Sequence, residues 1–240
     1  MDERSTEAAG PTMQHDAHLR RHRLRDAFDA ELSGVRDGVL RMGSLVESQI
    51  GEALAALVTH DAERALAVIA SDAPINAAQH AVSSLITLTI ATQQPVAGDL
   101  RNLLALDAIA AELERMGDYA GSVAKQVRKL APSAPTAGYA KLELMGALAS
   151  SQVRGILRAV VELDEAIARQ VAARDDELDA LYHALFAEVL AGMRSDPDTV
   201  DGGARILFAA HYLERVGDRV TNIAEQVVFL ATGETVDLND

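Results

Sequence analysis

The chain has 240 residues, 22 of them basic and 36 acidic, which gives a formal charge of −14, and it contains no Cys. The lack of Cys excludes disulfides, zinc–thiolate sites, iron–sulfur clusters and cysteine nucleophiles. The negative charge argues against non-specific nucleic-acid binding and suits a protein that binds cations or basic surfaces. No apolar stretch approaches the ~20 residues of a membrane helix and the N-terminus has no apolar signal segment, so we expect a cytoplasmic protein without direct membrane insertion.

The elements predicted along the chain are almost all helical. Residues 1–22 lack periodic apolar positions and are expected to form a disordered extension. From about Arg23, Ala and Leu dominate and no sustained period-two alternation occurs, so essentially no strand is predicted. The Pro-rich stretch 131–138 is the clearest linker. We therefore predict an all-α chain of two tandem three-helix bundles, over residues 23–131 and 138–233.

The two halves form an internal repeat. An offset of 103 residues aligns Met42-Gly43 with Met145-Gly146, and an offset of 100 aligns Leu113-Glu114-Arg115 with Leu213-Glu214-Arg215. The change in offset falls at a predicted turn, where differences in length are tolerated.

The most specific motif is E-R-[MV]-G-D, which occurs at Glu114–Asp118 and Glu214–Asp218. Its Glu and Asp lie on one face of a helix, where like charges repel, while Arg115 and Arg215 are expected on another face. The preceding helix of each half carries more oxygen donors at the same distance from the intervening turn. These donors are Asp72 and Asn76 in the first half, and Asp175 and Asp179 in the second.

Each half thus places four oxygen-bearing side chains level on neighbouring helices, beside the core stripe in a partly exposed groove. Oxygen ligands with some imidazole suit iron, zinc, manganese or magnesium. A solvated acidic face remains the alternative. His80 and His183 are more simply ordinary, partly buried histidines; His211 is a possible extra ligand in the second half. Asn222 is either an outer ligand or a helix-surface residue.

The paired boxes, the turn over residues 93–101 and the stretches 217–225 and 41–47 together resemble the PhoU family of phosphate-transport accessory proteins, over about residues 23–233. The resemblance implies multinuclear iron or zinc clusters at the repeated acidic motifs. Asn76 and Ser122 depart from the pattern of the second half, so we expect the second site to bind metal more tightly.

The resemblance also implies a regulator rather than an enzyme. Such proteins hold down phosphate uptake and the phosphate-starvation response when phosphate is plentiful, by contacting the ATPase subunit of the Pst phosphate ABC transporter and a PhoR-type histidine kinase. We also expect a homodimer. Two other classes stay open on the residues alone: a carboxylate-bridged di-metal hydrolase or oxidase, and a purely structural helical adaptor.

Overall fold

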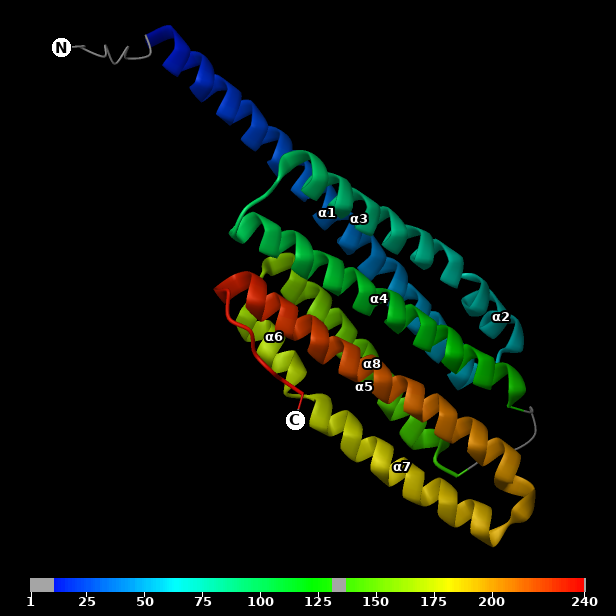
Figure 1. The fold of residues 1–240 in the computed structure, drawn as a ribbon. Coiled ribbons are helices and arrows are strands. Elements are labelled where there is room, and N and C mark those ends of the chain that lie inside the picture. Colours follow the sequence, from blue (N-terminus) through cyan, green and yellow to red (C-terminus); the bar gives the residue numbers. More distant parts are fainter. Residues whose placement is uncertain (1–10, 131–136, 240) are drawn as a thin grey trace, which may run out of the picture.

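The computed structural model describes residues 11–130 and 137–239, and within these ranges it contains helices and no strand (Figure 1). Each half of the chain has a long helix, a short and a longer helix in succession, and a second long helix. The first half contains α1 (Pro11–Thr59), α2 (Ala62–Ala70), α3 (Asp72–Gln93) and α4 (Gly98–Lys129). The second contains α5 (Tyr139–Glu162), α6 (Glu165–Ala172), α7 (Asp175–Ser195), the 3₁₀ turn η1 (Pro197–Thr199) and α8 (Val200–Thr232).

The second helix of each half, α2 or α6, begins with the same kind of cap. Asp61 accepts a hydrogen bond from the backbone N–H of Arg64 at the start of α2. Asp164 accepts bonds from the N–H groups of Ala166 and Ile167 at the start of α6. Such caps satisfy donors that have no partner within the helix. The predicted repeat and the all-α class of two three-helix bundles are confirmed, with the middle helix of each bundle broken after two turns.

The disordered extension expected over residues 1–22 is wrong for residues 11–22, which form the first turns of α1 and project beyond the bundle (Figure 1). Pro11 suits the first turn of a helix, and extending a helix that is already packed requires no new nucleation. The sequence pattern did not indicate this extension, because residues 11–22 have no periodic apolar positions. Residues 1–10 and the linker residues 131–136 lie outside the described part of the chain.

Four long helices form the centre of the molecule. Helices α4 and α8 make the most extensive contact, α1 packs on α4 and on α5, and α5 packs on α8. The α2–α3 arm covers the first half and the α6–α7 arm covers the second, on opposite sides in Figure 1. The buried apolar side chains of both halves join in one core, so the two bundles share their interior. Among the residues described, no helix combines the length and the apolar character needed to cross a bilayer.

The same glycine–leucine contact between the halves occurs twice, once from each half to the other. A Cβ on Gly43 would lie 2.5 Å from Leu157 Cδ2, and a Cβ on Gly146 would lie 2.3 Å from Leu54 Cδ2. These positions are related by the sequence repeat. Helices α1 and α5 therefore approach each other closely through one reciprocal glycine–leucine contact about a pseudo-twofold axis.

We expect Gly43→Val to lower the free energy of unfolding by about 2 kcal/mol, because the branched side chain overpacks the contact with Leu157. Gly51 lies on the same helix and is exposed, with no atom within 4 Å of an added Cβ. Gly51→Val should therefore raise stability by a few tenths of a kcal/mol through helix propensity. Urea unfolding of both variants measures the difference. Equal losses would show that backbone effects, and not the contact between halves, dominate.

Candidate functional site

Two groups of acidic and amide side chains lie on the outer flanks of the molecule. The first acidic site comprises Asp72 and Asn76 from α3 with Glu114 and Asp118 from α4. The second acidic site comprises Asp175 and Asp179 from α7 with Glu214 and Asp218 from α8. The structure brings the predicted residues of each group near one another: charge interactions link the carboxylates across the two helices, and Asn76 is hydrogen-bonded to Asp72.

In the first acidic site, Asn76 Nδ2 donates to Asp72 Oδ2 at 3.1 Å. Burial raises the pKa values of Glu114 and Asp118, and the charge of Asp72 raises both further. The second oxygen of Asp72 and the amide oxygen of Asn76 are buried without a hydrogen-bond partner. An orphaned buried oxygen costs free energy, and a bound cation would remove that cost.

The larger change in pKa is found in the second acidic site. Burial raises the pKa of Asp175 to about 6, with further contributions from the charges of Asp179, Asp218 and Glu214. Gly217 contributes to this burial, since a Cβ there would meet Asp175 Oδ1 at 2.6 Å. The site opens into a cavity of about 510 Å³ between α6, α7, α8 and the chain end.

Cationic side chains accompany the carboxylates of the second site. Arg215 Nη1 lies 2.5 Å from Asp218 Oδ2, and His211 Nδ1 lies 3.5 Å from Glu214 Oε2. The expectation that Arg215 points away from the site is therefore wrong, because a long side chain reaches a residue three positions along the helix. Arg115 behaves as expected and pairs with Glu112 at 2.5 Å.

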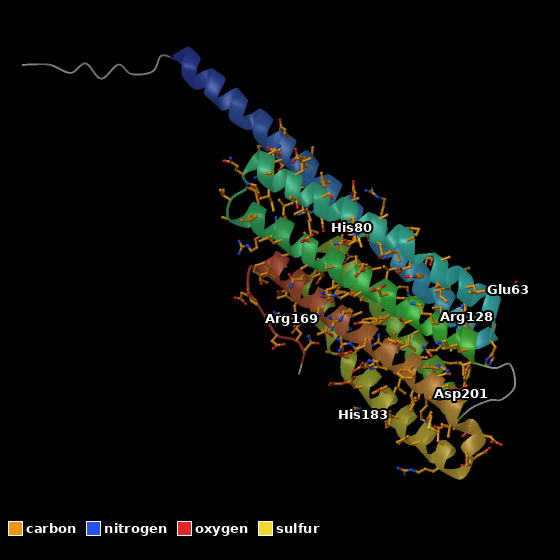
Figure 2. All side chains as sticks on the ribbon, turned by 45° about the vertical axis from the view of Figure 1, so that its right-hand side comes forward. Glu63, His80, Arg128, Arg169, His183 and Asp201 are labelled. Atoms are coloured by element: carbon orange, nitrogen blue, oxygen red, sulfur yellow. The ribbon has the colours of Figure 1, made fainter. Side chains whose placement is uncertain are left out.

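The histidines of the two outer arms are exposed, which corrects their interpretation as partly buried residues (Figure 2). His80 lowers the pKa of Glu114 through its charge, and His183 does the same for Glu214. Each histidine thus lies within electrostatic range of the acidic box of its own repeat. His183 Nδ1 also contacts the backbone carbonyl of Asp179 at 2.8 Å.

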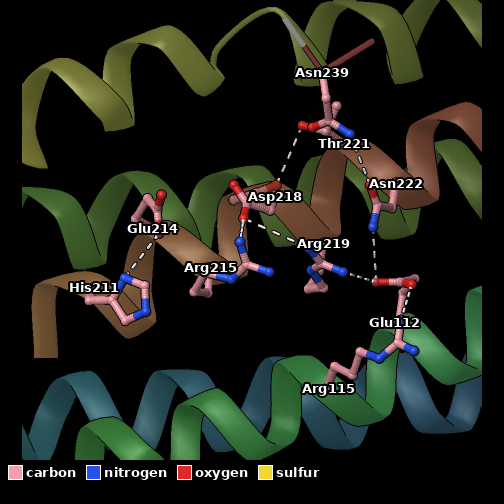
Figure 3. A network of polar contacts seen from close by, with 11 residues as sticks. Glu112, Arg115, His211, Glu214, Arg215, Asp218, Arg219, Thr221, Asn222 and Asn239 are labelled. Atoms are coloured by element: carbon pink, nitrogen blue, oxygen red, sulfur yellow. Dashed lines mark hydrogen bonds and ion pairs between the residues drawn. The ribbon is translucent and has the colours of Figure 1, made fainter. Parts of the chain in front are cut away.

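A polar network that was not predicted joins the two halves (Figure 3). Glu112 of α4 accepts hydrogen bonds from Arg219 at 3.1 Å and from Asn222 at 3.3 Å, both on α8. Arg219 also lies 3.7 Å from Asp218. Asn222 therefore links the halves. The sequence signal for this pairing was weak because its partners are more than 100 residues apart.

The other end of the same interface holds a different pair. Positions 112 and 219 correspond in the repeat to Tyr212 and Tyr119, whose rings stack with centroids 6.2 Å apart. The α4–α8 contact is thus symmetric in backbone and asymmetric in chemistry, with an ion pair beside the second acidic site.

The donors of both sites fit a metal ion in kind, because carboxylate and amide oxygens with nearby imidazole suit divalent metals. The orphaned oxygens of the first site also favour a metal ion, as does the buried Oε2 of Glu214, which makes no hydrogen bond and has only the 3.5 Å contact with His211. Among the side chains described, however, no three His, Asp or Glu converge on one point as a bound ion would require. The carboxylates of each site stand apart and Arg215 is paired with Asp218, so binding an ion would require these side chains to turn inward.

The PhoU domain family matches the chain twice, at residues 39–127 and 142–227. The PhoU homolog of Clostridium acetobutylicum, named a phosphate-specific transport system accessory protein, is 37% identical over 90% of this chain and 99% of its own length. The homolog of Rhizobium meliloti carries the same name and is 36% identical over 88% of this chain and 89% of its own length.

Two solved structures share the fold. The crystal structure of the phosphate transport system regulatory protein PhoU from Streptococcus pneumoniae aligns with a TM-score of 0.81 at 33% identity, over 88% of this chain and 99% of that one. The structure of PhoU from Pseudomonas aeruginosa aligns with a TM-score of 0.82 at 33% identity, over 86% of this chain and 100% of that one.

Proposed function

This chain belongs to the PhoU family, and we propose that it is an accessory protein of phosphate-specific transport that restrains phosphate uptake and the phosphate-starvation response when phosphate is plentiful. The names of its relatives support this role. The observation that carries the chemical part of the proposal is the occurrence of one acidic constellation twice, at equivalent places in the two repeats.

Metal ions are the proposed ligands of both acidic sites, with iron or zinc preferred and manganese or magnesium as alternatives. Carboxylates from two helices would hold the ions at each site. A bound cation supplies positive charge that neutralises the mutual repulsion of these carboxylates. The second site should bind more tightly, because it has Asp179 where the first has the neutral Asn76.

The proposed partners are the ATPase subunit of the phosphate ABC transporter and a PhoR-type sensor kinase, which the chain would meet from the cytoplasm. Each acidic site lies between an outer arm and a central helix, and its side chains are partly or fully exposed, so a partner can reach them without opening the core. Loaded with cations, these surfaces would present bound positive charge inside an acidic rim, which suits phosphate or a basic partner surface. We also propose that the protein acts as a homodimer.

The test uses a bacterium that lacks its own PhoU protein and carries a reporter of the phosphate-starvation response. In plentiful phosphate, this chain should restore repression, and purified protein should contain several equivalents of metal per chain by plasma mass spectrometry. A variant without the four box carboxylates should lose both properties. It carries Glu114→Gln, Asp118→Asn, Glu214→Gln and Asp218→Asn.

A control variant removes the same number and types of charge from exposed positions elsewhere. It carries Asp37→Asn, Glu63→Gln, Glu162→Gln and Asp201→Asn. This control should repress and bind metal as the unaltered chain does. Full repression by the box variant would sink the proposed role of the acidic sites, and failure of the unaltered chain to repress would sink the regulatory role.

A further inference from the structure

The chain doubles back after its last helix. Gly233 ends α8 in the left-handed conformation, with φ 81°. The following segment 234–239, here called the tail, returns along α8 toward the junction of α6 and α7 (Figure 1). Val236 and Leu238 of the tail pack against the core as partly buried residues.

Two hydrogen bonds hold the tail in place. The backbone N–H of Leu238 donates to Glu225 Oε1 at 3.0 Å, and Asn239 Nδ2 donates to Asn222 Oδ1 at 3.0 Å. Asn222 in turn bonds to Glu112 of the first repeat (Figure 3). The tail is thereby attached to the polar network that joins the two halves, next to the second acidic site.

The tail forms one wall of the cavity at the second acidic site. Asp237, Leu238 and Asn239 line it together with Asp175 and Asp179 of α7 and Asp218 of α8, while Arg169 and Arg219 contribute positive charge. Asp237 thus adds a carboxylate to a cavity that already holds three aspartates of the site.

We propose that the tail is a strap for the second acidic site, and that Asp237 supplies a further carboxylate ligand to a cation bound there. This inference rests on the proposed metal binding. A bound cation would attract the carboxylate of Asp237 and so favour the docked tail, and the docked tail would add a ligand to the cation. Binding and closure therefore stabilise one another by the same factor, as linkage requires.

The test isolates the second site by using the full chain with Glu114→Gln and Asp118→Asn as background. Mn²⁺ is the probe, titrated by calorimetry, because it prefers oxygen ligands. In this background, Asp237→Asn should weaken Mn²⁺ binding about 10-fold, a typical effect of losing one supporting group at a metal site. Glu234→Gln removes the same charge from the same tail at an exposed position outside the cavity lining, and should leave the affinity unchanged.

A second readout follows the strap itself. Mn²⁺ should slow hydrogen exchange of the Leu238 amide in the background protein and should do so much less in the Asp237→Asn variant. Equal Mn²⁺ affinities of the two tail variants, or exchange at Leu238 that ignores Mn²⁺, would overturn the strap. Absence of any Mn²⁺, zinc or iron binding would instead overturn the metal part of the proposed function, and the strap with it.

Discussion

Arg219→Ala is expected to lower the free energy of unfolding by about 3 kcal/mol, because it leaves Glu112 without its main partner at the interface between the halves. Both side chains of the pair are largely buried, with 14% of Arg219 and 12% of Glu112 exposed. Arg115 stays on Oε1 of Glu112, but Oε2, which accepts from both Arg219 and Asn222, would keep only the neutral amide as its partner (Figure 3). Urea unfolding measures the loss.

The chain offers its own control and its own rescue for this prediction. Arg115→Ala removes a partner of the same carboxylate that is 51% exposed, and should cost about 0.5 kcal/mol. The double variant Glu112→Tyr with Arg219→Tyr copies the stacked pair Tyr119–Tyr212 of the repeat-related position. Replacing a buried ion pair by packed apolar surface is often neutral, so the double variant should recover most of the lost stability. A double variant as unstable as Arg219→Ala would show that the two ends of the interface differ in backbone shape.

Much of the fold could be predicted from the sequence, because the repeat shows the residue pattern of each helix twice. The levels of the acidic residues could be predicted from their distance to the turn, since antiparallel neighbours place equidistant residues side by side. The core stripe of α4 follows in the same way from helical periodicity, and its residues are buried in the structure. They are Leu106, Ala110, Leu113, Gly117, Ala120 and Ala124.

What the sequence did not predict depends on contacts between distant segments or on flexible side chains. The Glu112–Arg219 pair joins two helices whose relative placement no local pattern encodes. Arg215 reaches Asp218 through a long side chain, where the helical wheel gives only the direction of its Cβ. The tail has no periodicity, and its hydrogen bonds to Glu225 and Asn222 come from a backbone amide and an Asn side chain. The substitution of Asn76 for the equivalent Asp179 could be read from the repeat, whereas these further differences between the two acidic sites could not.

The metal-free protein is expected to lose stability as the pH rises from about 4 to about 6, with Asp175 as the largest single contributor. Its pKa is raised to about 6 in the folded protein by burial and neighbouring charge, against about 3.9 in an unfolded chain. Between these values the folded state binds more protons than the unfolded state, so stability falls with rising pH and the penalty is complete above about pH 6. A shift of this size corresponds to about 3 kcal/mol, which solvent access to the cavity reduces to about 1–2 kcal/mol.

Asp175→Asn should therefore stabilise the metal-free protein by about 1–2 kcal/mol at pH 7.5 and have almost no effect at pH 4. Glu177→Gln is the matched control, because Glu177 lies in the same first turn of α7 but is exposed. It should change stability little at either pH. A gain from Asp175→Asn that is equal at both pH values would mean that charge repulsion at the site does not act on folding.

Saturating metal should reverse the order of the two proteins at pH 7.5. A cation present at 100 times its dissociation constant stabilises the folded state by about 2.7 kcal/mol, and Asp175→Asn removes one of the proposed carboxylate ligands. The unaltered chain should then be more stable than the variant, whereas it is less stable when metal-free. Thermal unfolding of both proteins with Mn²⁺ and with chelator reports this crossing. If the order does not reverse, the carboxylates pack against each other at a cost to stability that no cation removes. That result would favour basic side chains of a partner as the occupants of the site.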